Sequence, residues 1–510
     1  MNRKIKKECE SSCEFILPDY MGDIKKLLTS SAKVIPTGKF VGEGSVEISG
    51  SVEYEILYTD SDNSLTAINT SSDFTEVFPI NGDNYIDSAE QTRISNLKIR
   101  ITGPRKMLLK AELESSLSIC EEKSFSVEGD GFADQEKAEK CTCVINYSSS
   151  LFKKSGEREY AEIAERFAET EPDEIEVITS SATVHVESAK VGDGEVVLRG
   201  RHTVSALLKK GERAAPFKIK KYIPFDERIE VEGARADMLA VGSGFVSSVS
   251  IGLGSENGEC VAVANIIAEY NVEVVENLSE SVVTDAYFTD RETVNKYSVS
   301  SYSKSLYAAT GELSVDIKSD KESLLIGEAR DVIFASCEVK GSSLEISKNG
   351  CKIMGEILLS GVACEVNVDG SVTYVPIKLQ SPFEENVNID CQIPEDAALE
   401  YSLSVSDADI DVGADGIDAR CLFSLTVFLS QEHRIKRLSS CERLEGGEAT
   451  RDRSTVTVYY PKTGERLFDV AKKYKTTSAQ IALDNKLSES ALSSFDSADS
   501  LIGVKRLIIR

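Results

Sequence analysis

Side chains able to do chemistry are few and widely spaced along this chain of 510 residues. The histidines are His185, His202 and His433, and the first two lie within runs of alternating polar and apolar residues. No Gly-x-Ser-x-Gly turn with suitable triad partners occurs. With 85 Asp and Glu residues, no particular pair of carboxylates stands out as an acid–base couple. The sequence therefore predicts no catalytic residue and a protein that is not an enzyme.

Cysteine is the other residue type that could bind metal. Cys9 and Cys13 are four apart and Cys141 and Cys143 are two apart, but neither pair has a second pair at zinc-ribbon spacing. The 12 cysteines are expected to be free thiols in a chain without an export signal. No glycine-rich loop followed by Lys offers a phosphate site, so we expect neither a metal nor a cofactor.

The last 56 residues, 455–510, differ in character from the rest. Residues 455–460 form an alternating run, residues 461–477 and 478–485 have helical spacing, and residues 504–510 close with a second apolar run. Ser478 is the expected N-cap of the second helix. The order predicted is strand, helix, helix, strand.

This segment resembles the LysM domain. The resemblance rests on Gly464-x-x-Leu467-Phe468-x-x-Ala471-x-x-Tyr474, followed by Ile481, Asn485 and Gly503-x-x-Leu507-x-Ile509. LysM domains generally bind N-acetylglucosamine polymers in a shallow groove. The resemblance implies that one side of this groove is formed by Thr463, Gly464, Glu465, Arg466 and Leu467, and the other by Asn485, Lys486, Leu487 and Ser488.

Two positions depart from the family pattern. Glu465-Arg466 stands where the family usually has Asp-Thr, and Phe468 stands where Trp is frequent. A bulky charged pair would narrow or repolarise a groove for neutral sugar hydroxyls, whereas Phe468 is expected in the core of the module. Both a sugar polymer and a protein therefore remain possible ligands.

A short pattern occurs three times in the rest of the chain. Residues 29–34 read TSSAKV, residues 179–184 read TSSATV and residues 334–339 read FASCEV. A glycine follows the last residue of each box after sixteen positions, at Gly50, Gly200 and Gly355. Two anchors that keep one spacing at shifts of 150 and 155 residues indicate tandem domains.

Further anchors follow each glycine. A Pro lies beside an aromatic residue at Phe78-Pro79, Pro224-Phe225 and Pro382-Phe383, and later two alternating runs flank turns at Gly103-Pro104, Asn257-Gly258 and Asp415-Gly416. This is the chemistry of β-hairpins. The predicted fold is mainly β with minor α: three tandem antiparallel β-rich repeats, like a sandwich or barrel, and a small βααβ LysM domain.

Some segments read as helical. Residues 1–17 indicate a frayed lead-in or a short helix, residues 19–28 a short amphipathic helix, and residues 157–169 a longer one with Tyr160, Ile163, Ala164 and Phe167 on one face. The predicted domains are residues 1–145, 146–295 and 296–440, a flexible linker at 441–453, and the LysM domain at 454–510.

The combination of repeats with a LysM module resembles the SipL-type spore coat proteins, whose repeats are called SPOCS domains. The Leu17-Pro18-Asp19-Tyr20 lead-in supports it. The resemblance implies a scaffold in the mother-cell cytoplasm at the forespore surface, which tethers the basement coat ATPase through its LysM module. The alternative is a protein that binds peptidoglycan, as N-acetylglucosamine polymer, at the cell wall or spore cortex.

Charge limits the partners further. The net charge is −27, which disfavours a nucleic-acid partner because phosphate binding needs a basic surface. Residues 454–510 carry nine Lys and Arg against six Asp and Glu, so this segment has a net charge of +3. The start of the chain lacks the apolar stretch of a signal peptide, and no run reaches the length of a membrane helix. We therefore expect a cytoplasmic protein whose basic tail has its own partner.

Overall fold

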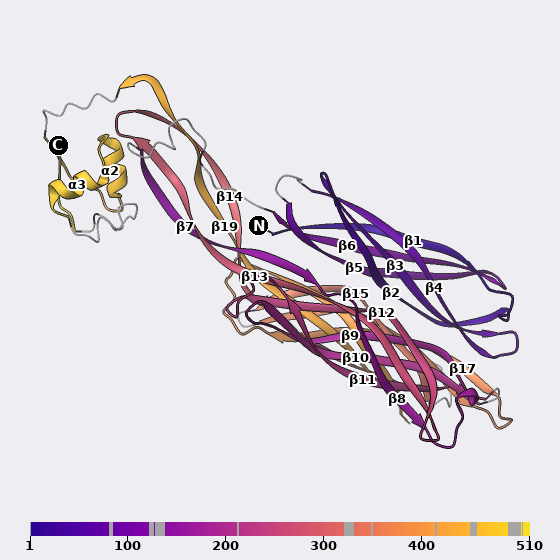
Figure 1. The fold of residues 1–510 in the computed structure, drawn as a ribbon. Coiled ribbons are helices and arrows are strands. Elements are labelled where there is room, and N and C mark those ends of the chain that lie inside the picture. Colours follow the sequence, from indigo (N-terminus) through magenta and orange to yellow (C-terminus); the bar gives the residue numbers. More distant parts are fainter. Residues whose placement is uncertain are drawn as a thin grey trace. The chain divides into compact units, whose positions relative to one another are not determined.

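The computed structural model divides into two compact units (Figure 1). The first comprises residues 1–122, 148–276 and 305–431, and the second comprises residues 123–147, 277–304 and 432–510. The residues described are 2–80, 85–121, 127, 138–211, 214–320, 331–347, 350–413, 416–448, 456–487, 501 and 503–510. The chain is mostly β, as the sequence predicts.

The first repeat is a pair of three-stranded antiparallel sheets. One sheet has the order β1-β6-β5 and the other the order β2-β3-β4. Their bounds are β1 (Asn2–Ile16), β2 (Ile24–Gly42), β3 (Ser45–Asp60), β4 (Leu65–Pro79), β5 (Tyr85–Gly103) and β6 (Lys106–Glu121). The first strand thus pairs with the last, and the predicted closing hairpin is β5–β6.

The second and third repeats have the same plan. In the second repeat the sheets are β11-β10-β9 and β12-β13-β7, with β8 also paired to β13; in the third they are β15-β16-β17 and β14-β19-β18. The bounds in the second repeat are β7 (Ala138–Lys154), β8 (Arg158–Phe167), a 3₁₀ turn (Pro172–Glu174), β9 (Ile175–Val191), β10 (Glu195–Lys210), β11 (Phe217–Glu230), β12 (Leu239–Glu256) and β13 (Glu259–Phe288). Those in the third are β14 (Arg291–Asp320), β15 (Asp331–Ser347), β16 (Gly350–Val366), β17 (Val372–Asn388), β18 (Ala397–Val412) and β19 (Gly416–Glu448).

Each repeat buries its own core between its two sheets. In the first repeat, Tyr54 and Phe74 of one sheet pack with Leu109 and Leu113 of the other. Alternation along the strands places one face of each sheet inward, since successive side chains point to opposite faces. Residues 257–258 form the predicted turn of the β12–β13 hairpin, because both have positive φ, at 56° and 82°.

The three glycine anchors have one structural role. Each lies beside an aromatic residue of the neighbouring edge strand and opposite a β-bulge on its other side. The ring occupies the space that a side chain would need. A Cβ atom would lie 2.5 Å from the ring of Phe74 at Gly50, 2.8 Å from Phe225 at Gly200 and 2.8 Å from Phe383 at Gly355.

One predicted anchor is wrong. The sequence pattern predicts Phe78-Pro79 as the first-repeat counterpart of Pro224-Phe225. In the structure, however, Gly50 pairs with Phe74, and Phe78 pairs with Val46. The ring over the glycine is what the repeats share. The prolines are tolerated because β4, β11 and β17 are edge strands.

The predicted helix at residues 157–169 is wrong, because β8 pairs with β13 there. A β-bulge opposite Ala262 and Val263 shifts the alternation of β8 by one residue. Tyr160, Ala164 and Phe167 all contact the core although their spacings are four and three. A bulged strand therefore shows the same apolar spacing as an amphipathic helix.

The helix expected at residues 19–28 is also wrong, and so are both alternatives for residues 1–17, a frayed lead-in or a short helix. A turn at Pro18–Met21 leads directly into β2, which has bulges beside Ile24 and Leu27. These bulges direct Ile24 and Leu27 to the core of the repeat and Leu28 to a second cluster. The first segment is β1, held by regular pairing to β6.

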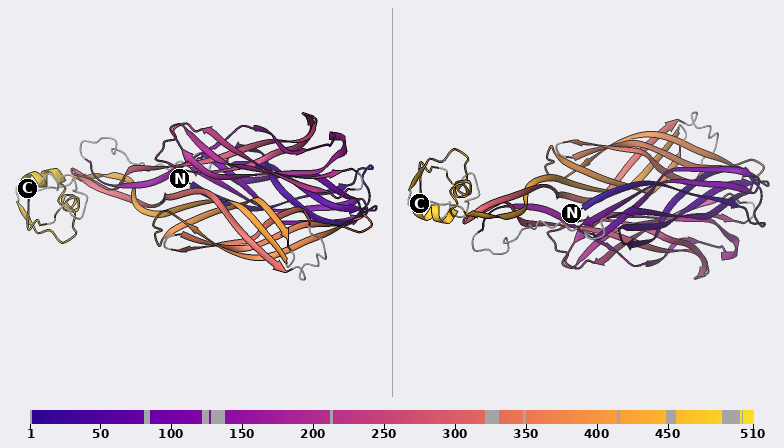
Figure 2. Two further views of the ribbon diagram at one scale, coloured as in Figure 1. Left: turned by 90° about the horizontal axis from the view of Figure 1, so that it is seen from below. Right: turned by 90° about the horizontal axis from the view of Figure 1, so that it is seen from above.

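The three repeats form one body rather than a string. Strands of the three repeats run alongside one another (Figure 2). An apolar cluster takes Leu28 and Leu57 from the first repeat, Leu207 from the second and Phe334 from the third. Ion pairs join the second and third repeats, including one between Lys220 and Asp407 at 2.6 Å.

The second unit contains the predicted βααβ module, with β20 (Thr457–Tyr459), α2 (Leu467–Lys473), α3 (Ser478–Asn485) and β21 (Leu507–Ile509). The N-cap of α3 is Thr477, not Ser478, because its hydroxyl accepts a bond from the Gln480 amide at 3.0 Å. The expected linker begins as a strand, since β19 continues to Glu448. Among the residues described, no helix has the length and apolar character needed to cross a membrane.

Replacing Gly200 with alanine is expected to destabilise the second repeat. The new methyl group would meet the carbonyl of His185 and the ring of Phe225, and overpacking of this kind costs about 1–3 kcal/mol. Chemical denaturation measures the change. Gly254→Ala is the control, because the nearest atom to its Cβ is 4.0 Å away on the same repeat. Equal stability of the two variants would show that the ring does not need the glycine.

Candidate functional site

The C-terminal module is built around two short helices. Phe468 is fully buried in α2, as predicted, and packs with Ile481 of α3 and with Leu507 and Ile509 of β21. Leu467 is also fully buried, so its side chain cannot contact a ligand at the predicted groove. The core of the module therefore uses one residue that the LysM resemblance assigned to the groove.

The turn before α2 is exposed at Thr463 and Gly464. Gly464 has a φ of 80°, a conformation that favours glycine. Glu465 closes this turn, because its carboxylate accepts bonds from the Tyr459 hydroxyl at 2.6 Å and the Lys462 amide at 3.0 Å. The bond to Glu465 raises the pKa of Tyr459 to about 12. One predicted wall of the groove is thus an ordered turn with Thr463 and Gly464 at its surface.

Arg466 is held at the N-terminus of α2. Its guanidinium donates to both oxygens of Asp469, at 2.9 Å and 2.7 Å, and to the sulfur of Cys141 on β7 at 3.2 Å. The bonds to Asp469 raise the pKa of Arg466. The residue pair that departs from the family pattern therefore has structural bonds within this unit.

The other predicted wall has one structural residue and one exposed cation. The Asn485 amide donates to the carbonyls of Ile481 and Ile508, and its oxygen accepts the Ile508 amide at 2.6 Å. This clamp holds the end of α3 against β21. Lys486 is exposed in the left-handed conformation and Leu487 is half-buried, whereas Ser488 lies outside the residues described.

The module packs against β13 through Tyr287, a residue with no feature in the sequence that singles it out. The ring of Tyr287 is fully buried and lies edge-on to Phe468, with 5.2 Å between centroids. Its hydroxyl donates to the Thr476 carbonyl at 2.6 Å, and burial raises its pKa. Only the alternation of β13 could have indicated an inward side chain here.

Ion pairs surround this contact. Lys472 lies 2.5 Å from Asp285, and Lys475 lies 3.3 Å from Glu292. Two of the basic residues that give the tail its positive charge are therefore neutralised within the unit. The exposed cations Lys486, Lys505 and Arg506 have no ion-pair partner in the part of the chain that the structure describes.

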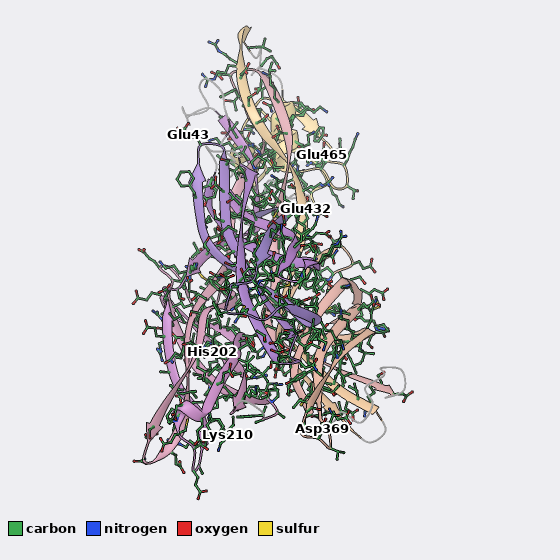
Figure 3. All side chains as sticks on the ribbon, turned by 90° about the vertical axis from the view of Figure 1, so that its right-hand side faces the viewer. Glu43, His202, Lys210, Asp369, Glu432 and Glu465 are labelled. Carbon is green, nitrogen blue, oxygen red and sulfur yellow. The ribbon has the colours of Figure 1, made fainter. Side chains whose placement is uncertain are left out.

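The histidines lie in packed surroundings. His202 is fully buried in the second repeat (Figure 3), where its Nε2 lies 3.0 Å from the Tyr270 hydroxyl and burial lowers its pKa to about 4. His185 is also buried, and its Nδ1 lies 2.8 Å from the Ser424 hydroxyl. Within the described ranges, no group of three or more His, Cys, Asp or Glu side chains could hold a metal ion.

The sequence model of the SipL SPOCS domain matches the chain twice, at residues 23–102 and 174–253. The matches span β2 to β5 and β9 to β12, which are the equivalent four strands of the first two repeats. This chain is a SipL-like protein with tandem SPOCS domains. The third repeat has the same strand plan.

The SPOCS domains support a sporulation-related role, and they come from a family that is not a known enzyme family. No curated protein and no solved structure matches the chain. The role of the C-terminal module must therefore be argued from its own surface.

Replacing Tyr287 with alanine is expected to loosen α2. The change empties a site in the core that the module shares with β13, and such truncations cost about 3–5 kcal/mol. Hydrogen exchange should accelerate at residues 467–473 while β10 in the second repeat stays protected. Tyr20→Ala is the control because Tyr20 is 84% exposed. Unchanged exchange at α2 would contradict the contact.

Acidification is expected to destabilise the second repeat through His202. Its folded pKa of about 4 lies below the ordinary value of 6.5, so the unfolded chain binds the proton more readily. The free energy of unfolding that neutral His202 contributes is fully present above about pH 6.5. It is lost as the pH drops toward 4, and the loss from this group is about 3 kcal/mol. Denaturation across this range should show a shallower pH dependence for His202→Gln than for the wild type. Parallel profiles for His202→Gln and the wild type would refute the assignment.

Proposed function

We propose that this chain is a non-enzymatic scaffold in spore coat assembly, which tethers the basement coat ATPase to the forespore surface from the mother-cell cytoplasm. The tandem SPOCS domains support the sporulation part of the proposal. The LysM-like module would be the docking unit. The assignment depends on the exposed cations Lys486, Lys505 and Arg506, which have no ion-pair partner within the described ranges.

The contacts within the module leave the side formed by the end of α3 and by β21 for a partner. Residues of α2 and the following turn are used in contacts with β13 and its neighbours, through Phe468, Lys472 and Thr476. The Asn485 clamp joins the end of α3 to β21, and Lys486, Lys505 and Arg506 lie on the segments next to this clamp. No described residue forms an ion pair with these cations. They would attract a partner with an acidic surface, because attraction between unlike charges steers association.

The three repeats have the rigidity and the repetition that a scaffold needs. Their shared apolar cluster and their mutual ion pairs hold three domains as one body. A body of this kind can present several equivalent surfaces at fixed spacing, and multiple contacts raise the effective concentration at a polymeric target.

Charge reversal at Lys486 is expected to weaken capture of the coat ATPase. Lys486→Glu and Lys505→Glu should each reduce binding several-fold with an unchanged melting temperature, because both side chains are exposed. Lys6→Glu in the first repeat changes the net charge equally and should bind as the wild type does. Arg466→Glu should instead lower the melting temperature, since it breaks the pair with Asp469.

Two results would contradict the docking assignment. One is equal capture by the full chain and by a chain without residues 454–510. The other is equal loss of binding for Lys6→Glu and Lys486→Glu, which would indicate a net-charge effect.

A second candidate function is binding of peptidoglycan as N-acetylglucosamine polymer. The exposed Thr463–Gly464 turn favours it, because one wall of the groove implied by LysM resemblance is open. Titration with N-acetylglucosamine oligomers distinguishes the two: tight, saturable binding that Lys486→Glu leaves unchanged would support the sugar ligand and demote the protein partner.

A further inference from the structure

The first repeat is held to the other two by fewer charged contacts than they share with each other. Among the residues described, one ion pair joins it to them, between Lys4 of β1 and Glu400 of β18 at 3.2 Å. The second and third repeats share several, which are Lys218–Asp409 at 2.9 Å, Lys220–Asp407 at 2.6 Å and Arg201–Glu312 at 2.6 Å. The second and third repeats are therefore the more firmly joined pair.

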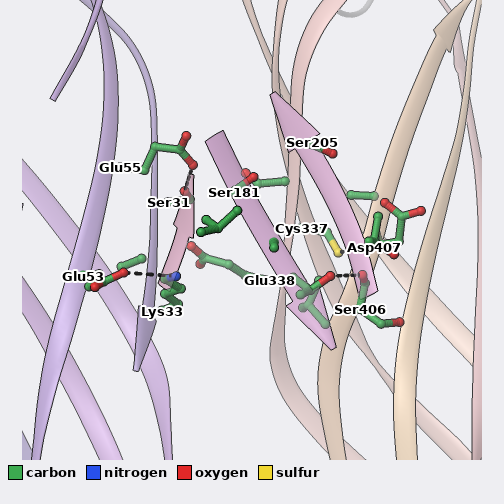
Figure 4. A pocket seen from close by; sticks show the side chains of 18 of the residues that line it. Ser31, Lys33, Glu53, Glu55, Ser181, Ser205, Cys337, Glu338, Ser406 and Asp407 are labelled. Atoms are coloured by element: carbon green, nitrogen blue, oxygen red, sulfur yellow. Dashed lines mark hydrogen bonds and ion pairs between the residues drawn. The ribbon is translucent and has the colours of Figure 1, made fainter. Parts of the chain in front are cut away.

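A cavity lies between the three repeats (Figure 4). It has a volume of about 740 Å³ and is lined by residues 31–34 of the first repeat, 179–183 of the second and 334–339 of the third, all within the first compact unit. Beside it, the first repeat contributes Leu28 and Leu57 to the apolar cluster that it shares with the other two. The first repeat thus meets its neighbours around a space that side chains do not fill.

Glu273 of β13 lies on the face of the second repeat that the other repeats approach. Its neighbours Val272 and Val274 point into the core of the second repeat, so Glu273 points to the opposite face of the sheet. There it is half-buried and accepts a bond from the Ser150 hydroxyl of β7 at 2.7 Å. The residue opposite it on β12 is Val241. Its own repeat thus supplies a hydroxyl and an apolar neighbour.

The charged groups that act on Glu273 come from the other two repeats. They are the Lys4 ammonium of the first repeat and the Glu400 carboxylate of the third, which are paired with each other. Burial raises the pKa of Glu273 to about 7, whereas the Ser150 bond and Lys4 lower it and Glu400 raises it. Two ionised carboxylates and one ammonium leave one negative charge in excess, and a proton on Glu273 removes it. Because burial disfavours an ionised carboxylate, the contact is more favourable with the proton than without it.

We propose that Lys4, Glu273 and Glu400 form a pH-sensitive latch, in which a proton on Glu273 holds the first repeat against the other two and its loss lets the first repeat open. The ion pairs between the second and third repeats do not involve Glu273, so these two stay together. Opening uncovers Glu273 on the side of β1, and its carboxyl then titrates nearer its ordinary value of 4.5. Since the closed form holds the proton more tightly, closure is strengthened as the pH falls through 7 and weakened above it.

Thiol labelling of the full chain measures the opening. Cys364 of the third repeat is 3% exposed and packs in the shared apolar cluster with Leu28 and Leu57, so it becomes accessible when the first repeat moves away. Its labelling by N-ethylmaleimide is located by mass spectrometry and divided by that of the exposed Cys143, which corrects for the general dependence of thiols on pH. From about pH 6 to about pH 8.5 this ratio should rise up to roughly tenfold, because the pKa of Glu273 is about 7 in the closed form and near 4.5 in the open form.

Three variants separate the latch from other effects of pH. Glu273→Gln has the shape of the protonated carboxyl, so its labelling ratio should stay low at both pH values. Lys4→Gln removes an ammonium that lowers the pKa of Glu273, so the rise should move to higher pH. Glu232→Gln makes the same change of charge at an exposed residue of the second repeat and should follow the wild type.

Three results would overturn the proposal. The first is a labelling ratio that does not change with pH in the wild type. The second is the same response in Glu273→Gln and Glu232→Gln. The third is parallel labelling of Cys260, which is fully buried in the second repeat, because it would show that this repeat unfolds rather than that the first repeat opens.

Discussion

A phenylalanine ring that lies over a bare glycine is the contact on which the form of each repeat depends. The central strand of each sheet that carries a box (β3, β10 and β16) must approach the ring of the edge strand on one side and accommodate a bulge of the first strand on the other. Gly200 shows why no other residue fits, because a Cβ there would meet both the carbonyl of His185 and the ring of Phe225. Bulges bend a strand and increase its twist. The glycine therefore fixes the place where the sheet bends, and the sixteen-residue spacing from the box fixes that place in the chain.

The bend has consequences for the packing of the repeats. The strand that carries the box crosses from its own core to the contact between repeats, as shown by Leu27, which packs inside the first repeat, and Leu28, which packs with Phe334 of the third. Apolar residues close one region of this contact, and polar residues of the boxes line the cavity beside it. One segment therefore serves both the fold of a repeat and its association with the others.

The sequence was sufficient for the number of repeats, their β class and the order of the terminal module, because glycine spacing and alternation are local signals. It failed where a bulge changes the alternation. Tyr160, Ala164 and Phe167 have helical spacing, but pairing with β13, about 100 residues later in the chain, makes this segment a strand. The residues around the segment do not reveal that distant pairing. The same limit applies to the candidate site. Asn485 looked like a groove residue, yet its amide is used to clamp β21, and Tyr287 gave no signal because its role depends on contact with a module that begins more than 160 residues later.

The contacts of Tyr287 and Cys141 show that the core of the C-terminal module includes residues from outside it. β13 supplies Ala262 to the core of the second repeat and Tyr287 to the core of the module. β7 places Cys141 beside Arg466, at the predicted wall of the groove. The core of the module is thus completed by strands of the second repeat, and Lys472 and Lys475 are neutralised by residues of β13 and β14. A module cut out of the chain would expose Phe468 and release these two cations, so it would present a more apolar and more positive surface than the intact protein does. Partner binding by the isolated module and by the full chain should therefore differ for reasons that lie in β13, and only the full chain presents the surface described here.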